Sequence, residues 1–136
     1  MRGSIVITNK PTHIPVPGED ILYTAGPVTG VPDYGKARFA HVTYLLREEG
    51  FEVISPIELG RIVDGTYEDY LLRDIKYGVV PATALVMLPG WPHSRGAMGE
   101  LNTAVTMGYP IGIWDSSRDV VLWVSDFRET VPWPCG

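Results

Sequence analysis

The 136-residue sequence contains only one cysteine and three histidines, and this scarcity excludes several kinds of site. A single cysteine, Cys135, cannot form an internal disulfide, which is typical of proteins in a reducing cytoplasm. His13, His41 and His93 stand at no metal-ligand spacing, so we expect no zinc site. Cys135 has no evident base partner, and no serine stands in a G-x-S-x-G elbow. We therefore expect no metal, no organic cofactor, and neither a thiol nor a serine nucleophile.

Long hydrophobic runs and excess positive charge are also missing. No run approaches the roughly 20 apolar residues that span a membrane, and the first residues lack the apolar core of a signal peptide. The formal net charge of -5 argues against a general nucleic-acid binder, which usually presents a basic face. A small anionic ligand stays open, because a few local donors can hold one. We predict a cytoplasmic protein with neither a membrane nor a nucleic-acid polymer as its partner.

The residues that are present follow the pattern of an α/β protein. Apolar runs closed by glycine or proline predict strands, and segments with helical spacing predict helices between them. In the first helix Ala37, Ala40, Tyr44 and Leu45 have helical spacing, and Gly50 is the expected end. The predicted strands span 21–27, 51–56, 82–88 and 109–115, the predicted helices 36–50, 66–78 and 94–107, and residues 4–9 and 119–127 could each add a strand.

Strand and helix alternate three times, which predicts a mostly parallel sheet of four to five strands with helices on both faces. Ligands of such sheets lie beyond the C-terminal ends of the strands. The loops AGPVTG, SPIELG and PGWPHSRG meet at that edge. We predict one domain over residues 1–136, with 1–20 as an N-terminal extension and 116–136 as a C-terminal tail.

The start of the helix at 94–107 has the features of an anion site beside a carboxylate. Ser94 is a good N-cap, the N–H groups of the first turn are free, and Arg95 adds forked donors suited to phosphate. Glu100 leans back over Gly96, and with Gly99 this leaves a bare notch in which a ligand could reach the carboxylate. The positive helix end favours an ionised Glu100, as attack on a sugar carbon requires. Alternatively, the glycines merely allow tight packing and Glu100 is solvated.

Other residues at the same edge have two interpretations each. The AGPVTG loop permits close approach to a ligand, but it matches neither G-x-G-x-x-G nor a Walker A loop and could be a simple turn. Tyr23, just before it, could be a core aromatic or a catalytic hydroxyl. Asp74 lies late in its helix and opposes the helix dipole, so it either has a role or pairs with Arg73 or Lys76.

Most of the chain, about residues 21–114, resembles the nucleoside 2-deoxyribosyltransferase-like proteins, in a branch common in phage genomes. The resemblance is carried by YTAGPVTGVPDYGKARFAHVTYLLREEGFEVISPIELG, then DYLLRDI, then LVMLPGWPHSRGAMGELNTAVTMGYPI, where PGW-x-x-SRGA-x-x-E is a specific motif. It implies a Rossmann-like (flavodoxin-like) three-layer fold and cleavage of the N-glycosidic bond of a deoxynucleoside or its 5′-monophosphate. It also implies a homo-oligomer and, for a phage protein, the host cytoplasm.

By position, the resemblance implies three catalytic roles. Glu100 matches the nucleophile, which attacks C1′ and forms a covalent deoxyribosyl intermediate. Tyr23 matches the tyrosine that orients this glutamate, and Asp74 the aspartate that assists the departing base. Water would resolve the intermediate in a hydrolase, and a second base in a transferase. The expected substrate-binding residues are Gly26, Pro27, Thr29, Gly30, Trp91, Ser94, Arg95 and Gly96.

The sequence also departs from the family's pattern. Ser94 and Arg95 stand where classical transferases often carry an acidic residue, and similar serine-containing loops hold the 5′-phosphate in the monophosphate N-glycosidase branch. This favours a nucleotide over a free nucleoside as the small-molecule partner. The C-terminal residues with which a neighbouring subunit completes the site in family members have no clear match.

Two other functions stay open. The same notch and arginine could belong to a non-catalytic module that binds or sequesters a nucleotide and needs no nucleophile. Alternatively, Trp114, Trp123 and Trp133 could mark an interaction surface.

Overall fold

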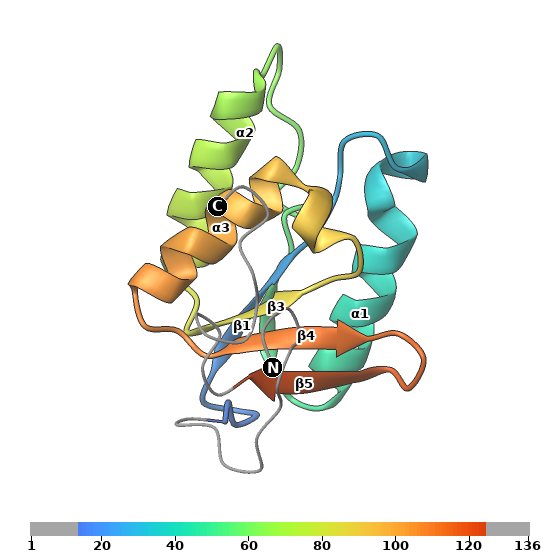
Figure 1. Cartoon of the computed structure of the whole chain (residues 1–136), viewed down its shortest axis with the longest axis vertical. Helices are drawn as coiled ribbons and strands as arrows, with labels where there is room; N and C mark the ends of the chain where they lie inside the picture. The colour runs from blue at the N-terminus through green and yellow to red at the C-terminus, as the bar shows by residue number, and fades with distance from the viewer. Residues whose placement is uncertain (1–13, 125–136) are drawn as a thin grey trace.

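The predicted alternation of strands and helices is confirmed in the computed structural model, which describes residues 14–124 (Figure 1). The predicted strand at 4–9, Trp133 and Cys135 lie outside these residues. The strands are β1 (Ile21–Ala25), β2 (Glu52–Ile54), β3 (Ala84–Met87), β4 (Ile111–Asp115) and β5 (Val120–Val124). The helices are α1 (Lys36–Glu48), α2 (Tyr67–Asp74) and α3 (Arg95–Thr106), with short helical turns η1 (Pro32–Gly35), η2 (Ile75–Val79) and η3 (Trp91–His93).

The strands form one five-stranded sheet in the order β2-β1-β3-β4-β5. The first four are parallel, and β5 runs antiparallel to β4 at the edge. The chain leaves β1 toward β2 on one side and returns to β3 on the other, so the strand order reverses between β1 and β3. The fold is therefore a Rossmann-like three-layer sandwich, and its switch point, where such sheets bind ligands, lies at the C-terminal ends of β1 and β3.

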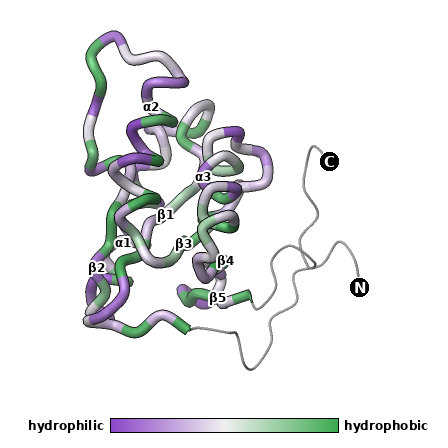
Figure 2. Tube along the Cα trace, turned by 90° about the vertical axis from the view of Figure 1, so that its left-hand side faces the viewer, coloured by the Kyte–Doolittle hydropathy of each residue, from purple (hydrophilic) through white to green (hydrophobic). Residues whose placement is uncertain are grey.

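Each face of the sheet packs its own apolar core, because successive strand residues point to opposite faces. On β1, Leu22 faces α1 and Tyr23 faces α2 and α3. On β3, Ala84 and Val86 face α1, whereas Leu85 faces α3. Figure 2 shows hydrophobic residues concentrated on the central strands, whereas the outer helices alternate between hydrophobic and hydrophilic residues. The two layers of helices thus cover two separate clusters.

The predicted face of α1 is wrong. Ala37, Ala40 and Tyr44 are exposed, and Leu45 is only partly buried. The buried face lies about half a turn around the helix from the predicted one, at 100° per residue. The reason is that the larger apolar side chains remove more surface from water than alanines do. Its buried residues are Phe39, Val42, Thr43 and Leu46.

The predicted C-terminal tail is partly a strand, in its described residues 116–124. β5 pairs with β4 from Val120 to Val124, so this part of 116–136 belongs to the sheet. Trp114 is buried in the core beneath α1, and Trp123 is half-buried against the same cluster. The burial of Trp114 contradicts its place in an exposed interface, whereas Trp123 keeps a partly exposed side chain and Trp133 lies outside the described residues.

The loops after β1 and β3 meet at the predicted edge. A Cβ added at Gly90 would lie 3.0 Å from Pro27 Cγ, and the Arg38 guanidinium donates to the Pro89 carbonyl at 3.1 Å. Gly90 has a φ of 88°, a left-handed conformation that glycine adopts without strain. No helix among residues 14–124 has the length and hydropathy needed to cross a membrane.

Candidate active site

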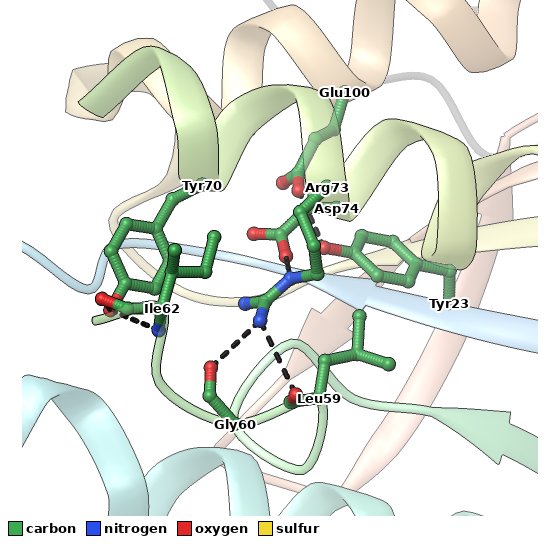
Figure 3. A network of polar contacts seen from close by, with 8 residues as sticks. All are labelled: Tyr23, Leu59, Gly60, Ile62, Tyr70, Arg73, Asp74 and Glu100. Atoms are coloured by element: carbon green, nitrogen blue, oxygen red, sulfur yellow. Dashed lines mark hydrogen bonds and ion pairs between the residues drawn. The ribbon is translucent and has the colours of Figure 1, made fainter. Parts of the chain in front are cut away.

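A buried hydrogen bond joins β1 to α3 at the centre of the candidate site (Figure 3). The Tyr23 hydroxyl donates to Oε2 of Glu100 at 2.5 Å. Tyr23 is 0% exposed and Glu100 is 5% exposed. Among the described residues, Glu100 is the only buried ionisable carboxylate or base, and carboxylates are almost never buried without a partner. This contact brings two predicted catalytic residues together from positions far apart in the sequence.

The local structure of α3 places Glu100 over the sheet. The Ser94 hydroxyl accepts from the Ala97 N–H at 3.2 Å, which confirms Ser94 as the N-cap and sets the start of the helix. Glu100 follows in the second turn, and Ala97 and Leu101 on the same side are buried in the core. The side chain of Glu100 therefore points inward at β1 instead of being solvated, which contradicts the surface interpretation.

Asp74 and Arg73 lie beside this pair, at the C-terminal end of α2 (Figure 3). Arg73 Nε lies 2.7 Å from Asp74 Oδ1, and both side chains are 15% exposed. The same guanidinium donates to the carbonyls of Gly60 at 2.7 Å and Leu59 at 3.3 Å. The predicted ion pair of Asp74 with a neighbour is confirmed. The pair also fixes the loop between β2 and α2 next to the site.

The protonation of Glu100 differs from the prediction. Burial raises its pKa from 4.5 to about 8; the Tyr23 hydrogen bond lowers the pKa, the negative charge of Asp74 raises it, and the positive charge of Arg73 lowers it. At neutral pH Glu100 is therefore mostly protonated, and the expectation of an ionised carboxylate is wrong. Desolvation outweighs the helix end, because one or two partial charges cannot replace the water that a buried carboxylate loses.

The two neighbouring groups are also shifted by burial. Burial raises the pKa of Asp74, and its contact with Arg73 opposes this. Burial, followed by the charges of Glu100 and Asp74, raises the pKa of Tyr23 well above 10, so its hydroxyl keeps its proton. The cluster thus holds two carboxyl groups with raised pKa values and a neutral hydroxyl donor, an arrangement suited to proton transfer.

The predicted notch on α3 is open on one side and filled on the other. A Cβ at Gly96 would meet only the Tyr67 hydroxyl, at 3.8 Å. A Cβ at Gly99 would lie 3.3 Å from a methyl carbon of Leu71 on α2, so this glycine serves helix packing. Arg95 is exposed, and its guanidinium carbon lies 4.8 Å from the centre of the Tyr67 ring. A cation and an aromatic ring therefore flank the open side.

The remaining predicted binding residues are split between the edge and the core. Thr29 and Gly30 are exposed, and Pro27 is half-buried at the contact of the two loops. Gly26 is buried, and a Cβ there would lie 2.9 Å from Leu88 Cβ, so its lack of a side chain serves the contact between strands β1 and β3. Trp91 is 5% exposed and packs in the core beneath α3. Contact of these residues with a ligand stays a prediction, and burial makes Trp91 and Gly26 the least accessible.

The sequence did not predict the contacts that Arg73 and Gly78 make in the site. Arg73 was expected only as a possible partner of Asp74, yet it also binds the loop carbonyls and acts on the charge of Glu100. Gly78 lies against the Tyr23 ring. A glycine inside the predicted helix was the signal available for Gly78, because glycine is a poor helix former without a packing reason. Within residues 14–124, no group of three or more His, Cys, Asp or Glu side chains could hold a metal ion.

Comparison with known proteins adds a family to this geometry. A search of curated proteins finds no match. A family model does match, over residues 20–113, which is more than half of the chain. The matched span begins just before β1 and ends within β4, and it contains Tyr23, Asp74 and Glu100. The chain therefore belongs to the family described as Domain of unknown function (DUF4406).

Proposed function

We propose that this protein cleaves the N-glycosidic bond of a deoxynucleoside 5′-monophosphate or a deoxynucleoside, by hydrolysis or by deoxyribosyl transfer. The observation that carries the proposal is the buried hydrogen bond between Tyr23 and Glu100, with Asp74 alongside. Two carboxyl groups in different environments are what glycoside chemistry uses. The resemblance of the sequence to the nucleoside 2-deoxyribosyltransferase-like proteins supports the same reaction.

In this proposal Glu100 acts as the nucleophile after losing its proton to solvent. One carboxylate oxygen bonds to C1′, and the bond from C1′ to the base nitrogen breaks. The electron pair leaves with the base, which takes a proton from the protonated form of Asp74, a carboxyl whose pKa is raised by burial. Water then attacks C1′, releases the Glu100 carboxylate and returns a proton to Asp74; in a transferase, the nitrogen of a second base replaces the water. The Tyr23 hydroxyl orients Glu100 throughout.

The open side of the α3 notch is the proposed place of the nucleotide. Arg95 and the uncommitted N–H groups of the first helical turn suit a 5′-phosphate, and the ring of Tyr67 suits a flat partner. Arg95 lies five residues before Glu100 on the same helix. The protein acts, in this proposal, in the cytoplasm without metal or cofactor. Assembly into a homo-oligomer and an origin in phage stay predictions.

The proposal is tested by incubating the protein with each common deoxynucleoside 5′-monophosphate and following release of free base by chromatography. We expect Glu100→Gln to lose at least about three orders of magnitude in turnover, because the amide is a poor nucleophile. Glu52→Gln, a change of the same kind at an exposed site on β2, is the matched control and should retain full turnover. Thermal melting of both variants confirms folding.

The pH dependence of kcat/KM gives a second reading of the same experiment. The nucleophile must be ionised, with a pKa raised to about 8, and Asp74 must carry the proton that the base takes, so kcat/KM should pass through a maximum and fall on both sides of it. A profile that rises and then stays level above the pKa of Glu100 would remove Asp74 as the proton donor. Full turnover in Glu100→Gln would remove Glu100 from the chemistry.

A non-catalytic nucleotide-binding or sequestering module is the second candidate. It is favoured by the burial of Glu100, which leaves this group protonated at neutral pH, and by the exposed Arg95 beside Tyr67. Calorimetry separates the two functions. Equal binding of a monophosphate by the wild type and Glu100→Gln, with no base released by either, would select the binding module.

A further inference from the structure

α2 widens into a π-helical turn at its C-terminal end. The turn spans Ile75–Val79, and the Val80 N–H donates to the Ile75 carbonyl, five residues back, at 2.9 Å. Such turns are rare, and they occur frequently at functional sites. This one begins directly after Asp74, so the widened backbone lies next to the candidate catalytic cluster.

Within this turn, the backbone of Gly78 contacts the Tyr23 ring. A Cβ added at Gly78 would lie 2.3 Å from Cε1, 2.8 Å from Cδ1 and 3.2 Å from Cζ of Tyr23. No side chain can occupy this position unless the ring moves. Gly78 is itself buried, and its φ is not among the positive ones, so space and not backbone conformation demands glycine here.

The ring has little freedom to move away. Tyr23 is completely buried, and its hydroxyl is hydrogen-bonded to Glu100 on α3. A displaced ring would carry the hydroxyl with it, because the two are rigidly joined. The close approach of Gly78 and the hydrogen bond to Glu100 therefore depend on one ring position.

We propose that Gly78 and the π-helical turn form a seat for the Tyr23 ring that holds its hydroxyl on Glu100. Gly78 is then a positioning residue of the site, one that acts through Tyr23. The consequence for turnover rests on the proposed function. The consequence for the Tyr23–Glu100 contact rests on the geometry alone.

The test compares Gly78→Ala with Gly112→Ala. Gly112, on β4, is an equally crowded buried glycine: a Cβ there would lie 2.4 Å from Val121 Cγ1 and 2.9 Å from the Trp123 ring. Its neighbours belong to β5, at the edge of the sheet away from Tyr23. Both variants should melt at lower temperature, because both overfill a packed site. Only Gly78→Ala should disturb Glu100.

Two measurements show this disturbance. A carbon-13 NMR titration, with Glu100 assigned through Glu100→Gln, should give a higher Glu100 pKa in Gly78→Ala and in Tyr23→Phe, since the Tyr23 hydrogen bond lowers that pKa. Turnover of the nucleotide should fall about 100-fold in Gly78→Ala, as expected for a displaced catalytic contact. In the double variant Gly78→Ala/Tyr23→Phe neither quantity should change beyond Tyr23→Phe alone. Gly112→Ala should match the wild type in both.

Each outcome decides the proposal. If Gly78→Ala kept the wild-type Glu100 pKa and the wild-type turnover, Gly78 would not position Tyr23. Additive losses of turnover in the double variant would contradict the proposal in the same way. If Gly78→Ala does not fold, replacing Tyr23 by the smaller leucine should restore folding, and failure to do so would equally overturn it. Should the wild type release no base while the Glu100 pKa still moves in Gly78→Ala, the proposed function fails and the seat stands.

Discussion

The two faces of the sheet differ in what they bury. Beneath α1 the core cluster consists of apolar side chains, among them Phe39, Leu46 and Trp114, and Thr43, the polar side chain that α1 buries, carries no charge. Beneath α2 and α3 an apolar core of similar extent also holds Glu100 bonded to Tyr23. The polar cluster thus lies in the layer that borders the switch point of the sheet.

This difference separates residues that stabilise the fold from residues that carry chemistry. A buried carboxyl lowers stability unless it is protonated or paired, so a protein that only needed to fold would place an apolar side chain there. The Tyr23 hydroxyl and the Arg73–Asp74 pair reduce this cost without removing it, as the raised pKa of Glu100 shows. The comparison therefore places the candidate site in the α2/α3 layer.

Removing the buried carboxyl of Glu100, which distinguishes the α2/α3 face from the α1 face, should have the largest effect. This effect is on the pH dependence of the free energy of unfolding. The pKa of Glu100 is about 8 in the folded protein and 4.5 in a freely solvated carboxyl. Between these values the unfolded chain is ionised and the folded one protonated, so the Glu100 contribution is complete below pH 4.5 and is lost as pH rises to about 8. Glu100→Gln should abolish this loss, worth as much as about 5 kcal/mol.

Denaturant unfolding of the wild type and Glu100→Gln at several pH values measures this effect. The difference between their free energies of unfolding should shift in favour of the variant as pH rises, and it should level off above the folded pKa. The exposed Glu52→Gln should show no such trend. If the difference between the two free energies of unfolding stayed constant from about pH 5 to about pH 9, Glu100 would be ionised over this whole range. That result would contradict its raised pKa.

On the apolar face, Phe39→Ala should cost about 4 kcal/mol of stability, because a completely buried aromatic leaves a cavity beneath α1. Turnover per folded molecule and the Glu100 pKa should be unchanged, because the sheet separates Phe39 from Glu100. Chemical denaturation measures the first quantity, and the base-release assay at a temperature below the melting point measures the second. A large loss of turnover in the folded variant would show that the two layers are coupled.

The smallest expected losses of stability are those from removing an arginine of an ion pair, either on the α2/α3 side or on the α1 side of the sheet. Arg73→Met should cost about 2 kcal/mol, because it leaves a largely buried Asp74 unpaired and frees the loop carbonyls that Arg73 binds. Arg47→Met should cost about 0.5 kcal/mol, because its pair with Glu58 on the α1 side is about half exposed. Urea unfolding compares the two. Equal losses would mean that burial does not distinguish these pairs.

Much of the fold was predictable because its signals are local. Apolar runs closed by glycine or proline became β1, β2, β3 and β4, and Thr66 and Ser94 cap α2 and α3 as their side chains predict. The buried face of α1 was not predictable from small residues alone, because competition among apolar side chains for the core decides the rotation of a helix.

The candidate site was predictable only in part, because some of its contacts join residues that are far apart in the sequence. The PGW-x-x-SRGA-x-x-E motif pointed to Glu100, and a strand position pointed to Tyr23. The role of Arg73 depends on carbonyls of a loop thirteen and fourteen residues away, and that of Gly78 on a ring in another strand. Such contacts join residues whose spacing in the chain follows no regular period.

The sequence by itself determined the strands, the helices and their starts, because hydrophobic periodicity and capping act between residues close in the chain. The resemblance to the nucleoside 2-deoxyribosyltransferase-like proteins also grouped Tyr23 with Glu100 in one predicted site. Only the tertiary structure decided that Glu100 is buried and protonated. The raised pKa of Glu100 depends on how much water the packed helices and strands exclude from its carboxyl group. Those elements come from distant parts of the chain, so the residues next to Glu100 in the sequence do not reveal it.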